Sequence, residues 1–411
     1  MSKRARNVGI SLLILLQSVA ACDRQPTGTD DWEPPEIGDL RIVEGPIGLA
    51  PTVVLAGVDG GCARAEYRTA GTLDLRVEHC QEDGELAIPL TRLLPASDYD
   101  LEVRAVGPEG ELGPVHGTTF LTPELPAGLQ EMSLDLQTPS VDMLTLMHVR
   151  TTSFWGFVIL DGDARVVWYW QDTDGAPRPI AKRANGNYAI LTQRLPRNDT
   201  TAVSRLREIT PTGTVVAEFV ENAEFQDFHH ELIATDEGTL LAVTLDSEIQ
   251  VDSTTWEGDR IVEWDPETGT IRERWDTFDF YSPAETVGPF SRQTDWGHMN
   301  SLHEAADGTL VVGLPAILQV INVSGDFSAI EWELGGSGAS VTPDDPFSGT
   351  HTATMPSPDH VLVFDNGIAR ESGEQFSRAI EYQLDIASGT ATTAWSFRPS
   401  PDLFSRIVSS A

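Results

Sequence analysis

Five hairpin-like segments of one pattern follow each other along the chain, and this repetition constrains the fold more than any other feature. Each segment contains a turn glycine, and an aromatic side chain follows six or seven residues later. The segments are residues 158–168, 207–219, 262–275, 319–332 and 382–395. Their turn glycines are Gly162, Gly213, Gly269, Gly325 and Gly389, and their aromatic residues are Trp168, Phe219, Trp275, Trp332 and Trp395.

A second unit, a turn followed by an apolar strand, lies between successive hairpins, at residues 184–193, 236–245, 306–315 and 357–366. Two alternating units per repeat correspond to four strands, which is typical of a β-propeller blade. The 35 glycines and 26 prolines also favour an all-β chain with many turns. We therefore predict a propeller over residues 124–411. The alternative is a β-sandwich whose turns recur by coincidence.

The number of repeats is low for a closed propeller. About four and a half fit between residues 140 and 411, and the chain stops in the connection after the fifth hairpin. Because an unclosed propeller leaves strand edges and sheet faces without partners, we expect this propeller to be incomplete at its C-terminus.

Residues 37–123 show a different pattern, in which short apolar stretches alternate with period two between turn residues. About seven short strands of this kind predict a small immunoglobulin-like β-sandwich. The stretch around Tyr99 resembles the tyrosine corner of a fibronectin type III strand pair.

The N-terminus has the features of an export signal. A basic start, MSKRAR, precedes an apolar core and then the sequence VAAC, which ends at Cys22 and resembles a bacterial lipobox. We expect a lipoprotein signal peptide over residues 1–22, a lipid on Cys22 and a proline-rich linker over residues 23–36. The protein is then periplasmic or at the cell surface, anchored by its lipid. An ordinary cleaved signal peptide is the alternative.

Two further cysteines, Cys62 and Cys80, lie in the predicted sandwich. In an exported protein such a pair indicates a disulfide, worth roughly 3 kcal/mol for a loop of this size. Two free thiols are the alternative.

The net charge is −36. A chain this acidic does not bind nucleic acid or an anionic membrane surface through its overall charge. A site for an anionic substrate must therefore be locally basic.

A histidine recurs eight to ten residues before the turn of the second unit in three consecutive repeats. Equivalent positions in a propeller are related by rotation about its axis, so these side chains should converge at the central channel. The three residues are His230, His298 and His351, and the equivalent position in the first repeat is Arg178. Structural histidines at the ends of inner strands are the alternative.

Three converging imidazoles suit two kinds of chemistry. One is a three-histidine metal site with an open position. The other is nucleophilic catalysis on an anionic group, in which one histidine attacks and the others donate hydrogen bonds or protons. Asn300, two residues after His298, shares its face if the segment is extended and adds a neutral donor.

Four segments carry a resemblance to a known family: FHHEL (228–232), DWGHMNS (295–301), EWELGG (331–336) and THTATMPSPDHVLVFDNG (350–367). They resemble, in order, segments of the bacterial arylsulfotransferases, also called aryl-sulfate sulfotransferases. The resemblance implies an exported protein with a small β-sandwich and a six-bladed propeller. It covers most of residues 124–370.

The resemblance also implies a reaction that needs no nucleotide sulfate donor, no other cofactor and no metal. A histidine takes the sulfuryl group of an aryl sulfate and passes it to a phenolic acceptor. The family pattern assigns the nucleophile to His351. It assigns sulfuryl binding and acid–base roles to His230, His298 and Asn300.

The chain departs from the family pattern at one cation. An arginine is expected shortly after the asparagine, but residues 314–316 read Leu-Pro-Ala. The lost charge-assisted hydrogen bonds are worth roughly 1.5–3 kcal/mol each. Arg292 and Arg370 are candidates to compensate, and Trp296 is a further candidate for substrate binding. Two alternative functions remain: a ligand-binding propeller without turnover, and a three-histidine metal-dependent hydrolase or lyase.

Overall fold

The computed structural model describes residues 32–70, 74–132, 143–195, 202–370 and 373–407, and almost all of its regular structure is β. Within these ranges the helical segments are short: α1 (Ala127–Gln130), α2 (Thr277–Phe280) and the 3-10 turn η1 (Pro315–Ile317). None of the helices described there has the length and apolar character needed to cross a membrane. The predicted all-β fold is confirmed.

The N-terminal module is one five-stranded antiparallel sheet in the order β1-β2-β4-β5, with β3 paired to the other edge of β2. Its strands are β1 (Leu40–Val43), β2 (Thr52–Arg68), β3 (Leu75–Pro89), β4 (Asp98–Val106) and β5 (His116–Leu121). We predicted about seven short strands, and the structure has five because β2 and β3 each run through two of them. Glycines with positive φ, Gly57, Gly60 and Gly61, let β2 bend with a register shift instead of ending there.

Two predicted contacts are present in this module. The hydroxyl of Tyr99 accepts a hydrogen bond from the backbone N–H of Leu94 at 2.8 Å, which is the tyrosine-corner contact. Cys62 and Cys80 are direct neighbours on β2 and β3 and form a disulfide.

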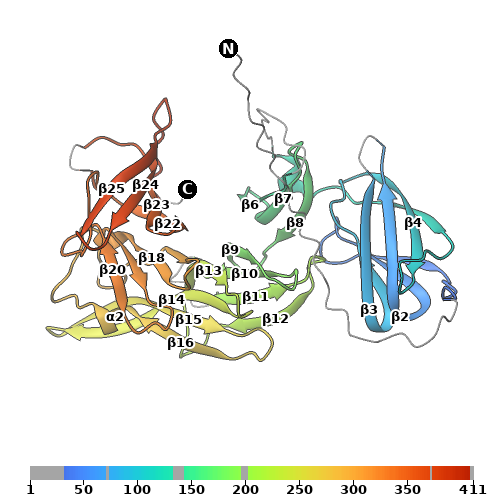
Figure 1. The fold of residues 1–411 in the computed structure, drawn as a ribbon, viewed down its shortest axis with the longest axis horizontal. Coiled ribbons are helices and arrows are strands. Elements are labelled where there is room, and N and C mark those ends of the chain that lie inside the picture. The colour runs from blue at the N-terminus through green and yellow to red at the C-terminus, as the bar shows by residue number, and fades with distance from the viewer. Residues whose placement is uncertain (1–31, 71–73, 133–142, 196–201, 371–372, 408–411) are drawn as a thin grey trace, which may run out of the picture.

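Five further sheets follow in chain order around an open arc (Figure 1). Sheet I contains β6 (Thr145–Arg150), β7 (Trp155–Leu160) and β8 (Val166–Gln171). Sheet II contains β9 (Ala176–Lys182), β10 (Tyr188–Gln193), β11 (Arg205–Ile209) and β12 (Val215–Val220). Sheet III contains β13 (Phe228–Ala234), β14 (Leu240–Val251), β15 (Thr254–Trp264) and β16 (Ile271–Asp276).

Sheet IV contains β17 (Ser301–Glu304), β18 (Leu310–Leu314), β19 (Gln319–Val323) and β20 (Ile330–Leu334). Sheet V contains β22 (Thr350–Ser357), β23 (His360–Asp365), β24 (Arg378–Asp385) and β25 (Thr390–Phe397), with the short β21 (Thr342–Pro343) at its edge. Within sheets II to V the main strands pair antiparallel with their neighbours in sequence, as in propeller blades.

The repeated aromatic residues explain why consecutive sheets stay together. Trp168 of sheet I packs on Tyr188 of sheet II at 5.1 Å and donates its indole N–H to the carbonyl of Pro211. Phe219 of sheet II contacts Phe228 of sheet III edge to face, with ring centroids 5.8 Å apart. Trp395 of sheet V is 49% exposed, and no described sheet follows it along the chain.

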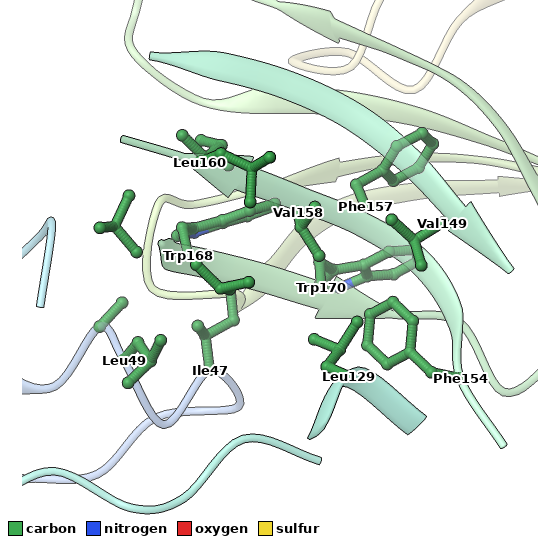
Figure 2. Close-up of a cluster of buried hydrophobic side chains, with 14 of the residues drawn as sticks. Ile47, Leu49, Leu129, Val149, Phe154, Phe157, Val158, Leu160, Trp168 and Trp170 are labelled. Atoms are coloured by element: carbon green, nitrogen blue, oxygen red, sulfur yellow. The ribbon is translucent and has the colours of Figure 1, made fainter. Parts of the chain in front are cut away.

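Sheet I also joins the N-terminal module to the arc. Ile47 and Leu49, from the connection between β1 and β2, lie in one buried cluster with Trp168 (Figure 2). Leu129 of α1 packs into the same cluster. The two parts of the chain therefore share a continuous apolar core at this junction.

The first strand of each sheet from II to V lies on the inner side of the arc. β9 contacts β13, β13 contacts β17, and β17 contacts β22. Residues at the start of these strands are brought close together although they are far apart in sequence.

Candidate functional site

The three histidines predicted from the repeat lie together at the inner strands. The ring of His230 is 4.7 Å from that of His298 and 6.1 Å from that of His351, measured between centroids. They come from sheets III, IV and V, because His230 lies on β13, His298 precedes β17 and His351 lies on β22. The structure thus brings the three rings into one cluster.

The backbone at two of these histidines has an uncommon conformation. His230 and His298 both have positive φ, 54° and 55°. A non-glycine residue there costs roughly 1–2 kcal/mol, and such strain concentrates at functional sites. The same conformation at two equivalent positions indicates that the orientation of these side chains is maintained at a cost in stability.

The side chains of His230 and His351 do not follow the regular alternation of their strands, because the strand pairing is irregular at both positions. On β13 the pairing jumps from His229 to Leu232, so that His230 lies in a bulge. On β22 it jumps from Thr350 to Thr352, so that His351 is the extra residue. Bulges of this kind redirect single side chains beside active sites.

A second histidine, His229, lies behind His230. The Nδ1 atoms of the two rings are 2.8 Å apart, at hydrogen-bond distance. His229 is only 1% exposed, and its Nε2 lies 3.2 Å from Oδ1 of the fully buried Asp259. That separation is an ion-pair distance, although neither atom makes a hydrogen bond of regular geometry.

We infer from this chain of contacts which ring nitrogen carries a proton. An ionised Asp259 holds the proton of His229 on Nε2, so that Nδ1 of His229 is the acceptor. His230 must then donate from its own Nδ1. In the neutral state its Nε2 then carries no proton.

His298 has a carboxylate partner as well. Its Nδ1 lies 2.7 Å from Oδ2 of Asp295, three residues earlier. Asp295 therefore orients the ring. In both His230 and His298, Nδ1 lies at hydrogen-bond distance from a neighbouring side chain, which orients the ring.

Asn300 and Asp259 tie these segments together. The Asn300 side-chain amide donates to the carbonyl of Thr350 at 3.0 Å, directly before His351. The second carboxylate oxygen of Asp259 accepts from the backbone N–H of Met299 at 2.8 Å. Asp259 thus contacts both the ring behind His230 and the backbone beside His298.

Glu231, next to His230, is a carboxyl group in an unfavourable setting. Burial raises the pKa of Glu231 to about 8, although hydrogen bonds from the backbone of Leu232 and Leu302 act in the opposite direction. The side chain is therefore largely protonated at neutral pH and adds little negative charge beside the histidines.

The three additional candidates for substrate binding lie elsewhere or are engaged in other contacts. Trp296 is fully buried among Phe278 and Tyr281, and its indole N–H donates to the carbonyl of Thr286. Its position is that of a core residue. Arg292 is exposed in a turn that hydrogen-bonds to Asp295.

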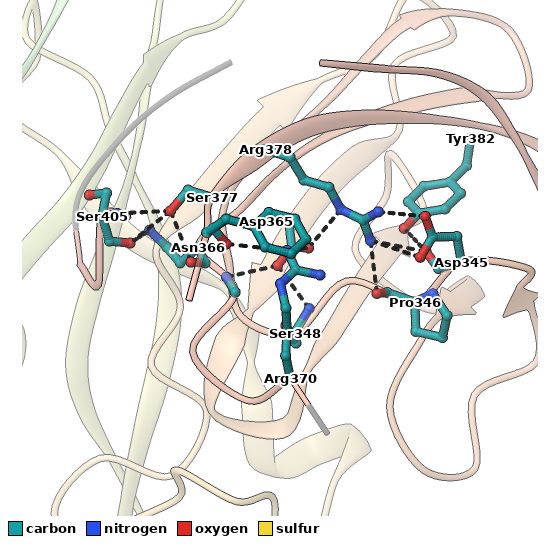
Figure 3. Close-up of polar contacts among 12 residues, drawn as sticks. Asp345, Pro346, Ser348, Asp365, Asn366, Arg370, Ser377, Arg378, Tyr382 and Ser405 are labelled. Atoms are coloured by element: carbon teal, nitrogen blue, oxygen red, sulfur yellow. Dashed lines mark hydrogen bonds and ion pairs between the residues drawn. The ribbon is translucent and has the colours of Figure 1, made fainter. Parts of the chain in front are cut away.

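Arg370 belongs to a polar network in sheet V (Figure 3). It donates to Oδ2 of the buried Asp365 at 2.6 Å, and Arg378 donates to the same oxygen at 3.0 Å. Because Asp365 and Asp345 pair with these arginines, the network is largely neutralised. This arrangement supports loop structure after β23.

The segment where the family pattern expects an arginine is apolar and buried. Leu314 is 0% exposed and Ala316 is 2% exposed. Ala316 donates its backbone N–H to the carbonyl of Gly297, next to His298. The chain is therefore apolar and packed at this point beside Gly297.

Two other expectations concern the lipid on Cys22 and the alternative of a metal site. Cys22 lies outside the described residues. Within them, no group of three or more His, Cys, Asp or Glu residues is arranged to hold a metal ion.

Sequence reasoning missed His229, Asp259 and Asp295 as parts of the site. Asp295 could have been predicted from the sequence, because it precedes His298 by three residues in a segment that the family resemblance already marked. Asp259 had no comparable signal, since only the pairing of β15 within sheet III brings it to His229.

Comparison with known proteins adds one informative match. A family model described as Arylsulfotransferase (ASST) matches residues 133–411. No curated protein matches the chain.

Matches among solved structures include hydrazine synthase of Kuenenia stuttgartiensis, with 10% identity and a TM-score of 0.39 over 88% of this chain and 99% of that one. Virginiamycin B lyase of Staphylococcus aureus shows 13% identity and a TM-score of 0.34 over 71% and 83%. A streptogramin B lyase shows 12% identity and a TM-score of 0.37 over 72% of this chain and 84% of that one. Similarity at this level carries no argument about function.

Proposed function

Because the chain belongs to the arylsulfotransferase family, we propose that it moves a sulfuryl group from an aryl sulfate to a phenol through a sulfohistidine at His351. The observation that carries this proposal is the cluster of three imidazole rings from three successive sheets. One ring can act as nucleophile while the other two are oriented through Nδ1 by His229 and Asp295.

In the first half-reaction a ring nitrogen of His351 attacks the sulfur of the aryl sulfate. The N–S bond forms, the bond between sulfur and the aryl oxygen breaks, and the electron pair leaves with that oxygen. The protonated form of His230 gives its Nε2 proton to the departing phenoxide, which leaves as a phenol. His230 is then neutral.

In the second half-reaction an acceptor phenol enters. Nε2 of His230 takes its proton, the phenol oxygen attacks the sulfur, and the N–S bond breaks with its electron pair returning to His351. The charge gained by His230 is shared with His229 and balanced by Asp259. His298, protonated and paired with Asp295, donates Nε2–H to a sulfuryl oxygen.

The reaction is tested by transfer of the sulfuryl group from 4-nitrophenyl sulfate to a second phenol. Release of 4-nitrophenol is the measured signal. The His351→Asn variant removes the nucleophile and keeps a polar side chain of similar size. We expect wild-type turnover and loss of both half-reactions in this variant. Turnover in His351→Asn at the wild-type rate would exclude His351 as the nucleophile.

We also propose that the chain is exported and carries a lipid on Cys22, on the basis of its N-terminal sequence. Metabolic labelling with a clickable fatty acid tests this. The label should appear on the wild-type protein and be absent from Cys22→Ser; equal labelling of both would contradict the anchor.

A further inference from the structure

The irregular pairing at the histidine site has a counterpart in sheet II. On β9 the pairing with β10 jumps from Pro177–Thr192 to Ile180–Ile190, which leaves one extra residue on β9. The shift lies at the same point of the inner strand as the bulges of β13 and β22. Arg178 lies within it.

The sequence register gives the same equivalence. Arg178 lies eight residues before Gly186, just as His230 lies eight residues before Gly238. Both glycines have positive φ in the turn that follows the inner strand. The strands β9 and β13 are also direct neighbours. Arg178 is therefore the sheet II equivalent of His230.

We propose that Arg178 is a fourth member of the site and binds the sulfuryl oxygens of the aryl sulfate monoanion. This inference rests on the proposed function. A guanidinium is suited to the task, because its planar fork donates to two oxygens of one anion. It supplies, from sheet II, a cation that residues 314–316 lack.

The surroundings of Arg178 leave its charge unmatched. The side chain is half-buried, and its Nε is buried without a hydrogen-bond partner among the described residues. The neighbouring charge is Arg150 of β6, and burial together with this like charge lowers the pKa of Arg178. No carboxylate pairs with Arg178 in the described part of the chain, although the protein carries a net charge of −36.

A second observation extends the basic region. The pKa of His148 on β6 is lowered by burial, by Arg178 and by Arg150. Arg150 itself lies over the ring of Trp155 at 4.1 Å. Arg150 stacked on an indole, with Arg178 as the neighbouring charge, forms a positive, partly aromatic region that is complementary to an aryl group carrying a sulfate. An anion bound here relieves the repulsion between the arginines.

The experiment compares the full-length wild-type protein with Arg178→Gln and Arg178→Lys. The control is Arg205→Gln, in the same sheet but on β11 and already paired with Glu218. Binding of 4-nitrophenyl sulfate and of uncharged 4-nitrophenol is measured by calorimetry, and transfer to a phenol is followed in parallel.

We expect Arg178→Gln to weaken 4-nitrophenyl sulfate binding by about 10- to 100-fold, as for loss of a hydrogen-bonded charge. Binding of 4-nitrophenol should change little, Arg178→Lys should recover part of the affinity, and Arg205→Gln should resemble wild type. Unchanged affinity for the sulfate ester in a folded Arg178→Gln protein overturns the inference.

The two proposals fail in different ways. If the wild type binds the ester with an Arg178 dependence but transfers nothing, the binding role stands and the proposed function fails. If transfer continues undiminished in Arg178→Gln, the function stands and the binding role fails. Should the Gln variant not fold, phenylglyoxal labelling of wild-type Arg178 replaces it: protection by 4-nitrophenyl sulfate supports the inference, and no protection overturns it.

Discussion

His229 and His230 are adjacent in the chain and yet hydrogen-bond to each other through their Nδ1 atoms, 2.8 Å apart. Neighbours on a regular strand point to opposite faces. The positive φ of 54° at His230, within a bulge of β13, turns the two rings together. One ring then faces Asp259 and the other faces the histidine cluster.

Replacing Asp259 with Asn tests the role of this pair as a positioning relay. An amide N–H opposite Nε2 of His229 favours the other tautomer, so His229 donates to His230 and Nε2 of His230 carries the proton. We expect kcat to fall by roughly 10²-fold or more, as when a general base is lost, with a smaller change in KM.

The tautomers are read directly from the ¹⁵N shifts of histidine ring nitrogens. Asp259→Asn should exchange the protonated and unprotonated nitrogens of His230, and Asp265→Asn, in the turn between β15 and β16, should not. A rate loss without any tautomer change would assign Asp259 a structural role only.

Strain at His298 predicts an unusual preference for glycine. With φ at 55°, an alanine retains the cost of the left-handed backbone, whereas glycine does not. We expect His298→Gly to be more stable than His298→Ala by about 0.5–1 kcal/mol in urea unfolding, with both inactive. At the exposed Thr294, where φ is not positive, the alanine variant should instead be more stable than the glycine variant. Equal stability of the two His298 variants would argue against strain.

Glu231 makes stability depend on pH. Its pKa is about 8 in the folded protein and 4.5 as the ordinary value, so the folded state binds the proton more tightly than the unfolded state. The contribution of Glu231 to the free energy of unfolding is complete below pH 4.5 and is lost as the pH rises towards 8. Glu231→Gln keeps the shape of the neutral acid. We expect the variant to lose stability less steeply than wild type from pH 4.5 to 8 in thermal unfolding; parallel curves would contradict the raised pKa.

Much of the arrangement could be predicted from the sequence because it depends on local signals. Turn glycines and the aromatic residues after them mark hairpins, and each of the first four aromatic residues lies where two sheets meet. The proximity of the three histidines followed from the same turns. Residues at equal spacing from the turns occupy equivalent positions in successive sheets, and these positions meet on the inner side of the arc. The disulfide was likewise predicted, because Cys62 and Cys80 are two cysteines within one small β module of a chain with an export signal.

The remaining features depend on non-local packing. β2 passes through a glycine-rich bend that the pattern suggested was a strand end, because a bulge there keeps the pairing intact. Trp296 beside His298 looked like a substrate contact, but strand-like alternation does not apply in a loop, and it packs into the core. Asp259 acquires its role only when sheet III forms, and no spacing in the sequence points to it.

The central claim, a sulfuryl group carried on His351, is tested most directly by mass spectrometry of the intermediate. The protein is mixed with 4-nitrophenyl sulfate without an acceptor, quenched at alkaline pH and digested. The account predicts one added sulfuryl group on the peptide that contains His351, lost when a phenol is added before quenching. Release of 4-nitrophenol and transfer to a phenol with the added group on another residue, or with no modified peptide at any time, would contradict it.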